Sequence, residues 1–177
     1  SMHPGVRNLI PVAYGEAIAT DADGPVRIGQ HGCLILMPLY QEQGRHRRSA
    51  NALESLIRDV PDDAGLLNAL GYLLTDQMDR HGEAREYLEQ ALALEPNNPA
   101  IIDSMGWVLF NLGEFEAALG HLERAYGLFP DAEVAAHIVD TQWALGNREQ
   151  ALELLQQKLA ENPESRHLKE LDQRLAP

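Results

Sequence analysis

The fold is decided by the stretch Ala100-Ile-Ile-Asp-Ser-Met-Gly-Trp-Val-Leu-Phe-Asn-Leu112, together with Gly113 and the run Glu114-Phe-Glu-Ala-Ala-Leu-Gly-His-Leu-Glu-Arg-Ala-Tyr-Gly-Leu128 that follows it. In the first part, large apolar residues recur every three or four positions, which predicts one buried face of an α-helix. Gly113 suits the left-handed conformation that commonly ends a helix. In the second part, Ala118, Leu122 and Ala125 share one helical face. The stretch therefore predicts two helices joined by a short turn, with Gly106 and Ala118 at their closest contact.

This helical hairpin is repeated along the chain. Prolines stand at Pro61, Pro96, Pro130 and Pro163, separated by 35, 34 and 33 residues. A small residue and then a large apolar residue precede each proline at the same distances, as Ala118 and Leu122 precede Pro130. A period near 34 is typical of stacked helical hairpins. Each unit buries its apolar face against a neighbour, and the stack leaves a long concave surface.

The repeats divide the chain into segments. We expect an irregular N-terminal arm, a degenerate repeat, three regular repeats and a capping helix, over residues 1–29, 30–63, 64–98, 99–131, 132–163 and 164–177 respectively. The repeat 64–98 has one inserted residue, and Asp79 stands where the turn glycine is expected, which predicts a longer first helix or a bulged turn. In the arm, the segments Val12–Thr20 and Val26–Ile28 favour either a weak β-hairpin or no regular structure. The predicted class is an all-α, right-handed solenoid.

Composition excludes several functions. The chain has 177 residues and a formal net charge of −13, and residues 64–177 hold 19 acidic against 8 basic side chains. Such a field repels nucleic acid. The seven histidines are scattered without metal-ligand spacing, and the single cysteine, Cys33, has no partner for a disulfide or a zinc site. We find no catalytic motif and expect no enzyme activity, cofactor, metal or small-molecule substrate.

The repeat resembles the tetratricopeptide repeat (TPR) family at Met105-Gly106, Leu109, Gly113, Phe115, Ala118, Leu122, Ala125 and Pro130. The resemblance covers residues 64–163 best and is absent over 1–29. More narrowly, Asn68–Tyr72, Asp103–Val108, Pro130–His137 and Trp143–Gly146 look like the C-terminal repeats of TPR lipoproteins of the Gram-negative outer membrane. That resemblance implies a bacterial adaptor in the periplasm or at the outer membrane, with a cytoplasmic location as the alternative.

In such an array the first helix of each hairpin lines the concave groove. The residues that flank its inward stripe are therefore the candidate partner-binding residues: Asn68, Tyr72, Asp76, Asp103, Trp107, Phe110, Asn111, His137, Asp140 and Trp143, with Thr75 beside them. Amides can hold a peptide backbone, and aromatic rings supply contact area at low entropic cost. Other roles stay open. Phe110 and Trp143 are equally suited to packing between hairpins, Asp103 and Asp140 to capping or to bonding a neighbouring repeat, and His137 to a satisfied interface or a pH-sensitive contact.

The groove does not suit an acidic ligand. TPR domains that bind the C-terminal carboxylate of chaperones carry basic and amide residues where this chain has Leu34, Pro38, Ala69, Ala100 and Ser104. We therefore expect a partner protein or peptide of basic or apolar character. The leading function is a protein-binding scaffold or adaptor. The alternatives are a module that forms homo-oligomers, for which the N-terminal arm is one route, and a regulatory domain of a larger enzyme.

Overall fold

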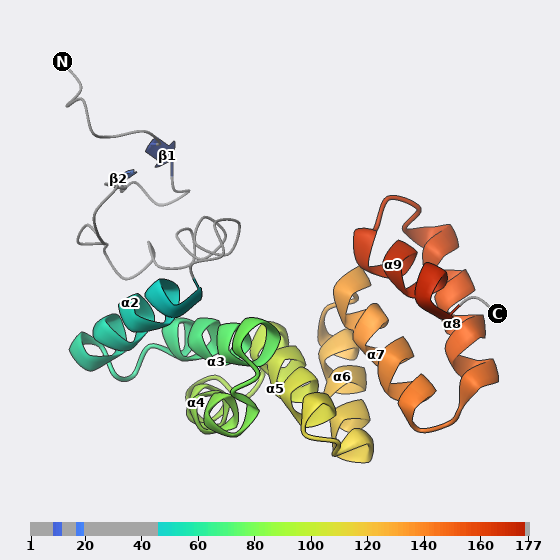
Figure 1. Ribbon diagram of the computed structural model, residues 1–177, viewed down its shortest axis with the longest axis horizontal. Coiled ribbons are helices and arrows are strands. Elements are labelled where there is room, and N and C mark those ends of the chain that lie inside the picture. Colours follow the sequence, from blue (N-terminus) through green and yellow to red (C-terminus); the bar gives the residue numbers. More distant parts are fainter. Residues whose placement is uncertain (1–8, 12–16, 20–45, 176–177) are drawn as a thin grey trace.

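The computed structural model describes residues 9–11, 17–19 and 46–175. Two short strands and eight helices make up this part of the chain: β1 (Leu9–Pro11), β2 (Ala17–Ala19), α2 (His46–Asp59), α3 (Ala64–Met78), α4 (His81–Leu94), α5 (Pro99–Asn111), α6 (Phe115–Leu128), α7 (Ala132–Ala144), α8 (Arg148–Glu161) and α9 (Arg166–Leu175). Figure 1 shows the helices following one another from α2 at one end to α8 and α9 at the other. None of the helices in residues 46–175 combines the length and the apolar character needed to cross a membrane.

The helices form a stack of antiparallel pairs. α3 packs on α4, α5 on α6 and α7 on α8, while α3 also contacts α5, and α9 contacts both α7 and α8. α3, α5 and α7 are the first helices of three successive hairpins, and α9 continues their row (Figure 1). The predicted all-α solenoid with a C-terminal capping helix is thus confirmed, apart from the two three-residue strands.

Short polar caps and turns set the limits of the helices. The Asn98 side chain accepts a hydrogen bond from the backbone N–H of Ala100 at 3.0 Å, and Pro99 occupies the first turn of α5. The Asp131 carboxylate likewise accepts from the N–H of Glu133 at 2.8 Å at the start of α7. Both caps satisfy donors that have no partner inside the helix. Gly113 follows the end of α5 and has a φ of 81°, the left-handed conformation expected of a residue that ends a helix.

The inserted residue in the repeat 64–98 lengthens its first helix. α3 has 15 residues, whereas α5 and α7 have 13 each. Asp79 then adopts the left-handed conformation at φ 53°, and its backbone N–H bonds the Leu74 carbonyl. The structure therefore has the longer first helix and not the bulged turn. Asp79 adopts the left-handed conformation that Gly113 adopts in the next hairpin.

The α3–α4 and α5–α6 hairpins each close around a glycine and a leucine. A Cβ placed on Gly106 would lie 2.6 Å from Leu122 Cγ and 3.3 Å from the Ala118 carbonyl oxygen. Gly71 has the same relation to Leu88, at 2.5 Å. The predicted contact of Gly106 with the Ala118 turn of the second helix is therefore confirmed. Leu88 and Leu122 are themselves fully buried, so the glycines allow two helices to enclose a large side chain.

In the N-terminal arm, the structure describes two short strands. β2 lies within the segment Val12–Thr20 and pairs antiparallel with β1, with Leu9 opposite Ala19. A pairing with Val26–Ile28 stays an expectation. Val26–Ile28, Cys33, Leu34 and Pro38 lie outside the described residues.

Gly106→Ala should destabilise the protein. The added methyl group meets Leu122 and the α6 backbone in a filled space, so we expect the free energy of unfolding to fall by about 1–3 kcal/mol. Gly120→Ala is the matched control, because nothing lies within 4 Å of its added Cβ. There the better helix propensity of alanine should raise the free energy of unfolding by about 0.5–1 kcal/mol. Urea denaturation measures both, and equal effects would contradict the close contact.

Asp79→Gly should stabilise the protein. Glycine adopts a positive φ without the steric cost that a side chain carries, so we expect the free energy of unfolding to rise by about 0.5 kcal/mol. Asp76→Gly, inside α3, removes the same charge and should lower the free energy of unfolding by about 1 kcal/mol. Thermal and urea denaturation of both variants measure these changes. A loss of stability in Asp79→Gly would exclude strain at this turn.

Candidate partner-binding surface

The first helices of the hairpins present equivalent positions in a row. Tyr72, Trp107, Asp140 and Arg174 are each the ninth residue of their helix, α3, α5, α7 and α9 respectively. Because these helices lie side by side, the four side chains follow one another across the same face of the solenoid. The row is aromatic in the first two hairpins and charged in α7 and α9.

A hollow of about 430 Å³ opens on this face. Of the predicted residues, Tyr72, Asp76, Trp107, His137 and Asp140 line it. Glu133, His167, Glu170 and Arg174 line it too and were not predicted. The structure thus brings five of the ten candidate residues together at one hollow, together with four polar residues from α7 and α9.

A buried pair lies beside the hollow, which one of its members, His137, lines. His137 Nδ1 and Asp103 Oδ1 lie 2.9 Å apart, joining α7 to α5, and the two residues are only 7% and 8% exposed. Burial disfavours the charged imidazole, but the hydrogen bond and charge of Asp103, with Glu133 and Asp140 nearby, outweigh it and raise the pKa of His137. The expected bond between Asp103 and a neighbouring repeat is present, and His137 is a satisfied interface residue.

Trp107 stacks on two other rings. Its indole stacks on His137, with ring centroids 4.2 Å apart, and on Phe110, with centroids 4.9 Å apart and planes within 5°. Phe110 packs towards the core shared by α3, α4 and α5, whereas His137 comes from α7. Its own neighbours thus cover part of the ring, and the contact of Trp107 with a partner stays a prediction.

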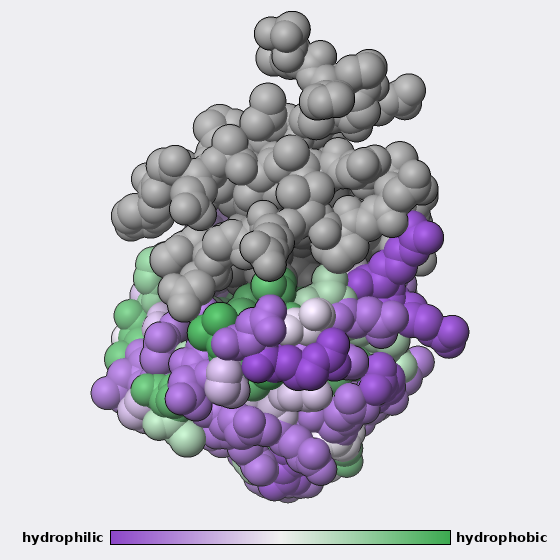
Figure 2. All heavy atoms as spheres, turned by 90° about the vertical axis from the view of Figure 1, so that its left-hand side faces the viewer, coloured by the Kyte–Doolittle hydropathy of each residue, from purple (hydrophilic) through white to green (hydrophobic). Residues whose placement is uncertain are grey.

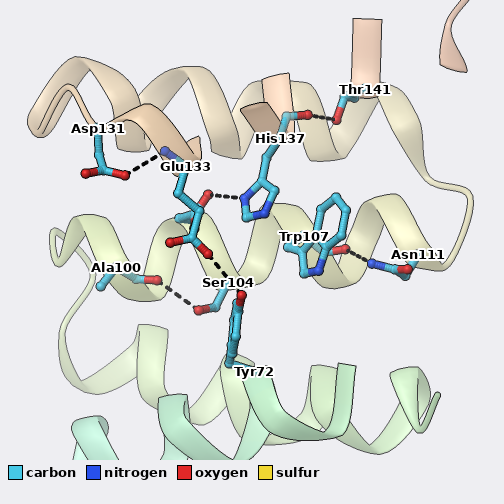
Figure 3. Close-up of polar contacts among 10 residues, drawn as sticks. Tyr72, Ala100, Ser104, Trp107, Asn111, Asp131, Glu133, His137 and Thr141 are labelled. Carbon is cyan, nitrogen blue, oxygen red and sulfur yellow. Dashed lines mark hydrogen bonds and ion pairs between the residues drawn. The ribbon is translucent and has the colours of Figure 1, made fainter. Parts of the chain in front are cut away.

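A hydrogen bond joins α3 to α7, the first helices of two hairpins that flank the α5–α6 hairpin. The Tyr72 hydroxyl donates to Glu133 Oε1 at 3.0 Å. In Figure 3, Glu133 extends from α7 towards Tyr72 on α3, while α5 lies between the two helices. Burial, followed by the charges of Glu133 and Asp76, raises the pKa of Tyr72, so the phenol stays protonated and remains a donor. Tyr72 and Glu133 line the hollow on the side of α3.

An ion pair bounds the opposite side. The Arg174 guanidinium of α9 donates to Asp140 Oδ1 of α7. The two side chains differ in exposure, since Asp140 is 13% exposed and Arg174 is 59% exposed. Burial raises the pKa of Asp140 even though Arg174 and His137 act in the other direction.

The remaining candidates lie away from the hollow. Asn111 is exposed, and one of the two N–H donors of its amide bonds the Trp107 carbonyl at 2.8 Å. Asn68 is half-buried, and its carbonyl oxygen is buried without a hydrogen-bond partner among the described residues. Trp143 packs against the core of α7, α8 and α9, under the Arg148 guanidinium. Thr75 is buried and bonds the Gly71 carbonyl at 2.9 Å, so its placement in the groove was wrong.

The residues that sequence analysis missed come from two places. Glu133 is the second residue of α7, where the equivalent positions hold Gly65 and Ala100, so no pattern marks it. Glu170 and Arg174 belong to α9, which was treated only as a cap. The spacing of 34 residues from Asp140 to Arg174 was a usable signal. In the described part of the chain, no group of three or more His, Cys, Asp or Glu residues is arranged to hold a metal ion.

The buried pair makes folding depend on pH. Because the pKa of His137 is raised in the folded state, its charge contributes stability that is fully present below about pH 6.5, the unfolded value, and is lost as the pH rises through the folded value. Asp103→Asn removes the charge that offsets burial, so the ¹H–¹³C NMR titration midpoint of His137 should fall below about 6.5. The variant should also lose about 3 kcal/mol of unfolding free energy at pH 5–6, and less at higher pH. An unchanged midpoint would contradict the assignment.

Comparison with known proteins gives the family. Tetratricopeptide repeat models match residues 37–100, 77–136 and 109–175. The TPR repeat-containing protein PA4667 of Pseudomonas aeruginosa is 48% identical over 86 residues, which are 49% of this chain. The chain spans only 15% of the length of that relative.

Solved structures show the same fold. The TPR protein TTC0263 of Thermus thermophilus superposes with a TM-score of 0.71 at 18% identity, covering 82% of this chain and 80% of that one. MamA gives a TM-score of 0.61 at 19% identity over 72% of this chain and 75% of its own. The first TPR domain of human RPAP3 gives 0.59 at 21% identity, over 69% and 98%. With its repeats matched across more than half of its length, this chain belongs to the tetratricopeptide repeat family.

Proposed function

We propose that this chain is an adaptor that binds a segment of a partner protein in the hollow formed by α3, α5, α7 and α9. The TPR fold is generally a protein–protein interaction scaffold, and the hollow of about 430 Å³ is the observation that supports this particular surface. That volume is in the range of ligand-binding sites. Its lining combines ring edges with hydrogen-bonding groups held in place by contacts between hairpins, which suits a site that is formed before the partner arrives.

The chemistry of the hollow favours a basic or apolar segment. Asp76, Glu133, Asp140 and Glu170 contribute four carboxylates to the lining, and Arg174 is the one arginine or lysine among the lining residues. Figure 2 shows that the described surface at the α2 end is mostly hydrophilic, with smaller hydrophobic areas between. An acidic partner would meet repulsion both at the hollow and from a chain of net charge −13.

We also propose a location in the bacterial envelope, in the periplasm or at the outer membrane. The support is the resemblance of Asn68–Tyr72 and Asp103–Val108 to the TPR lipoproteins of that compartment. Fractionation of the natural gene product in its host tests it. Recovery with periplasmic or outer-membrane markers is expected, and recovery with cytoplasmic markers would exclude it.

Site-specific photocrosslinking in the host tests the binding surface. Benzoylphenylalanine is placed at Glu170, which lines the hollow, and in a second variant at Glu123, an exposed residue of α6. We expect a defined protein adduct at position 170 and none at 123. Adducts at 123 alone would move the interface to the second helices. Adducts with a second copy of this chain would instead favour a homo-oligomer.

A further inference from the structure

Within the proposed binding surface, we propose that Arg174 occupies the position of a partner's cationic side chain, so that the partner segment carries arginine or lysine and displaces Arg174 from Asp140. The inference rests on the proposed function and narrows its partner. It is carried by three observations: the unequal exposure of the two charged groups, the surplus of carboxylates around them, and the row of rings beside them.

The ion pair joins a buried acid to an exposed base. Asp140 is held in the wall of α7 with a side chain 13% exposed, whereas the Arg174 side chain is 59% exposed in the last turn of α9. Within residues 46–175, the ion pair is the one polar contact of the Arg174 side chain. An arginine so exposed is still largely hydrated, so the cost of separating the pair falls mainly on Asp140.

Asp140 cannot lose its counter-charge as easily. Among the described residues, Arg174 is the one hydrogen-bond donor to its carboxylate. A mostly buried carboxylate without a cation carries a large desolvation penalty. His137 faces it from the same helix, but that imidazole is already paired with Asp103. Another cation that reaches into the hollow would therefore satisfy Asp140 when Arg174 departs.

The residues around Asp140 carry more negative charge than Arg174 neutralises. Glu133 receives a single side-chain hydrogen bond in the described structure, from the neutral Tyr72 hydroxyl, and Asp76 is exposed at the same rim. Glu170 is paired with Arg166 at 2.7 Å, but both of these groups are exposed. His167 is the remaining titratable group of the lining. A cation entering here finds Asp140 and Glu133, whereas an anion finds no unpaired arginine or lysine.

The row of ninth residues adds a second element of recognition. Trp107 and Tyr72 occupy the positions before Asp140 in the row, and the Trp107 edge lines the hollow although its ring is stacked on His137. A segment that places a basic side chain at Asp140 would lay its next side chain along these rings. Alternating basic and apolar residues in the partner suit this surface.

Fluorescence anisotropy with a labelled peptide of alternating arginine and leucine tests the inference. Arg174→Gln should strengthen binding by about threefold, since the peptide cation no longer competes with Arg174 for the Asp140 carboxylate. Asp140→Asn should weaken binding by tenfold or more, because the peptide cation loses its buried partner. When Arg174→Gln is added to Asp140→Asn, it should not increase the affinity for the peptide further, since the neutral side chain at position 140 does not form an ion pair with Arg174.

Arg85→Gln is the matched control, because Arg85 is also exposed, pairs with Glu89 and Glu114 and lies outside the hollow. It changes the net charge by the same amount as Arg174→Gln. Equal strengthening by both variants would show a long-range charge effect and overturn the inference, as would tighter binding of a glutamate–leucine peptide. If Arg174→Gln and Asp140→Asn bind like the wild type while the adduct at position 170 persists, the inference fails and the adaptor function stands. Absence of an adduct at position 170 in the otherwise wild-type chain would instead overturn the adaptor function itself.

Discussion

Each helical hairpin of this chain has an apolar face that only a neighbouring hairpin can cover, and the concave surface is a consequence of that requirement. Leu88, Leu122 and Leu155 are fully buried at equivalent places in three successive hairpins. To enclose them, paired helices approach at Gly71 and Gly106, where a side chain would collide. The first helices are thereby placed side by side, and their ninth residues come into one row.

Polar contacts between the first helices then determine the shape of that surface. The Asp103–His137 pair joins α5 to α7, the Tyr72–Glu133 bond joins α3 to α7, and Asp140–Arg174 joins α7 to α9. The Asp103–His137 pair is buried, and hydrogen bonds and ion pairs shielded from water are stronger than those at the surface. The hollow is the space that these contacts leave open. Its rim is acidic because two of the participating groups that line it, Glu133 and Asp140, are carboxylates, and two more, Asp76 and Glu170, stand beside them.

The fold could be predicted closely because it is encoded locally. Proline spacing, the Gly106–Leu122 contact and the Gly113 turn are all visible within one repeat. The site was predicted less completely because it depends on contacts between repeats. Whether a partner can reach the Trp107 ring is decided by His137, thirty residues along the chain, and the roles of Glu133 and Arg174 appear only when α3, α7 and α9 are placed together. Thr75 was misplaced for a different reason, since it is buried and its hydroxyl bonds the Gly71 carbonyl of its own helix.

The two tryptophans allow the central claim, that partners bind in the hollow, to be measured in one spectrum. Trp107 lines the hollow, whereas Trp143 packs into the core of α7, α8 and α9, so their indole N–H signals report on different places. In ¹H–¹⁵N NMR spectra recorded as the photocrosslinked partner's segment is added, the Trp107 indole signal should shift together with amides of α5, α7 and α9, and the Trp143 signal should stay. Shifts confined to α4, α6 and α8, with both indole signals unmoved, would contradict the account.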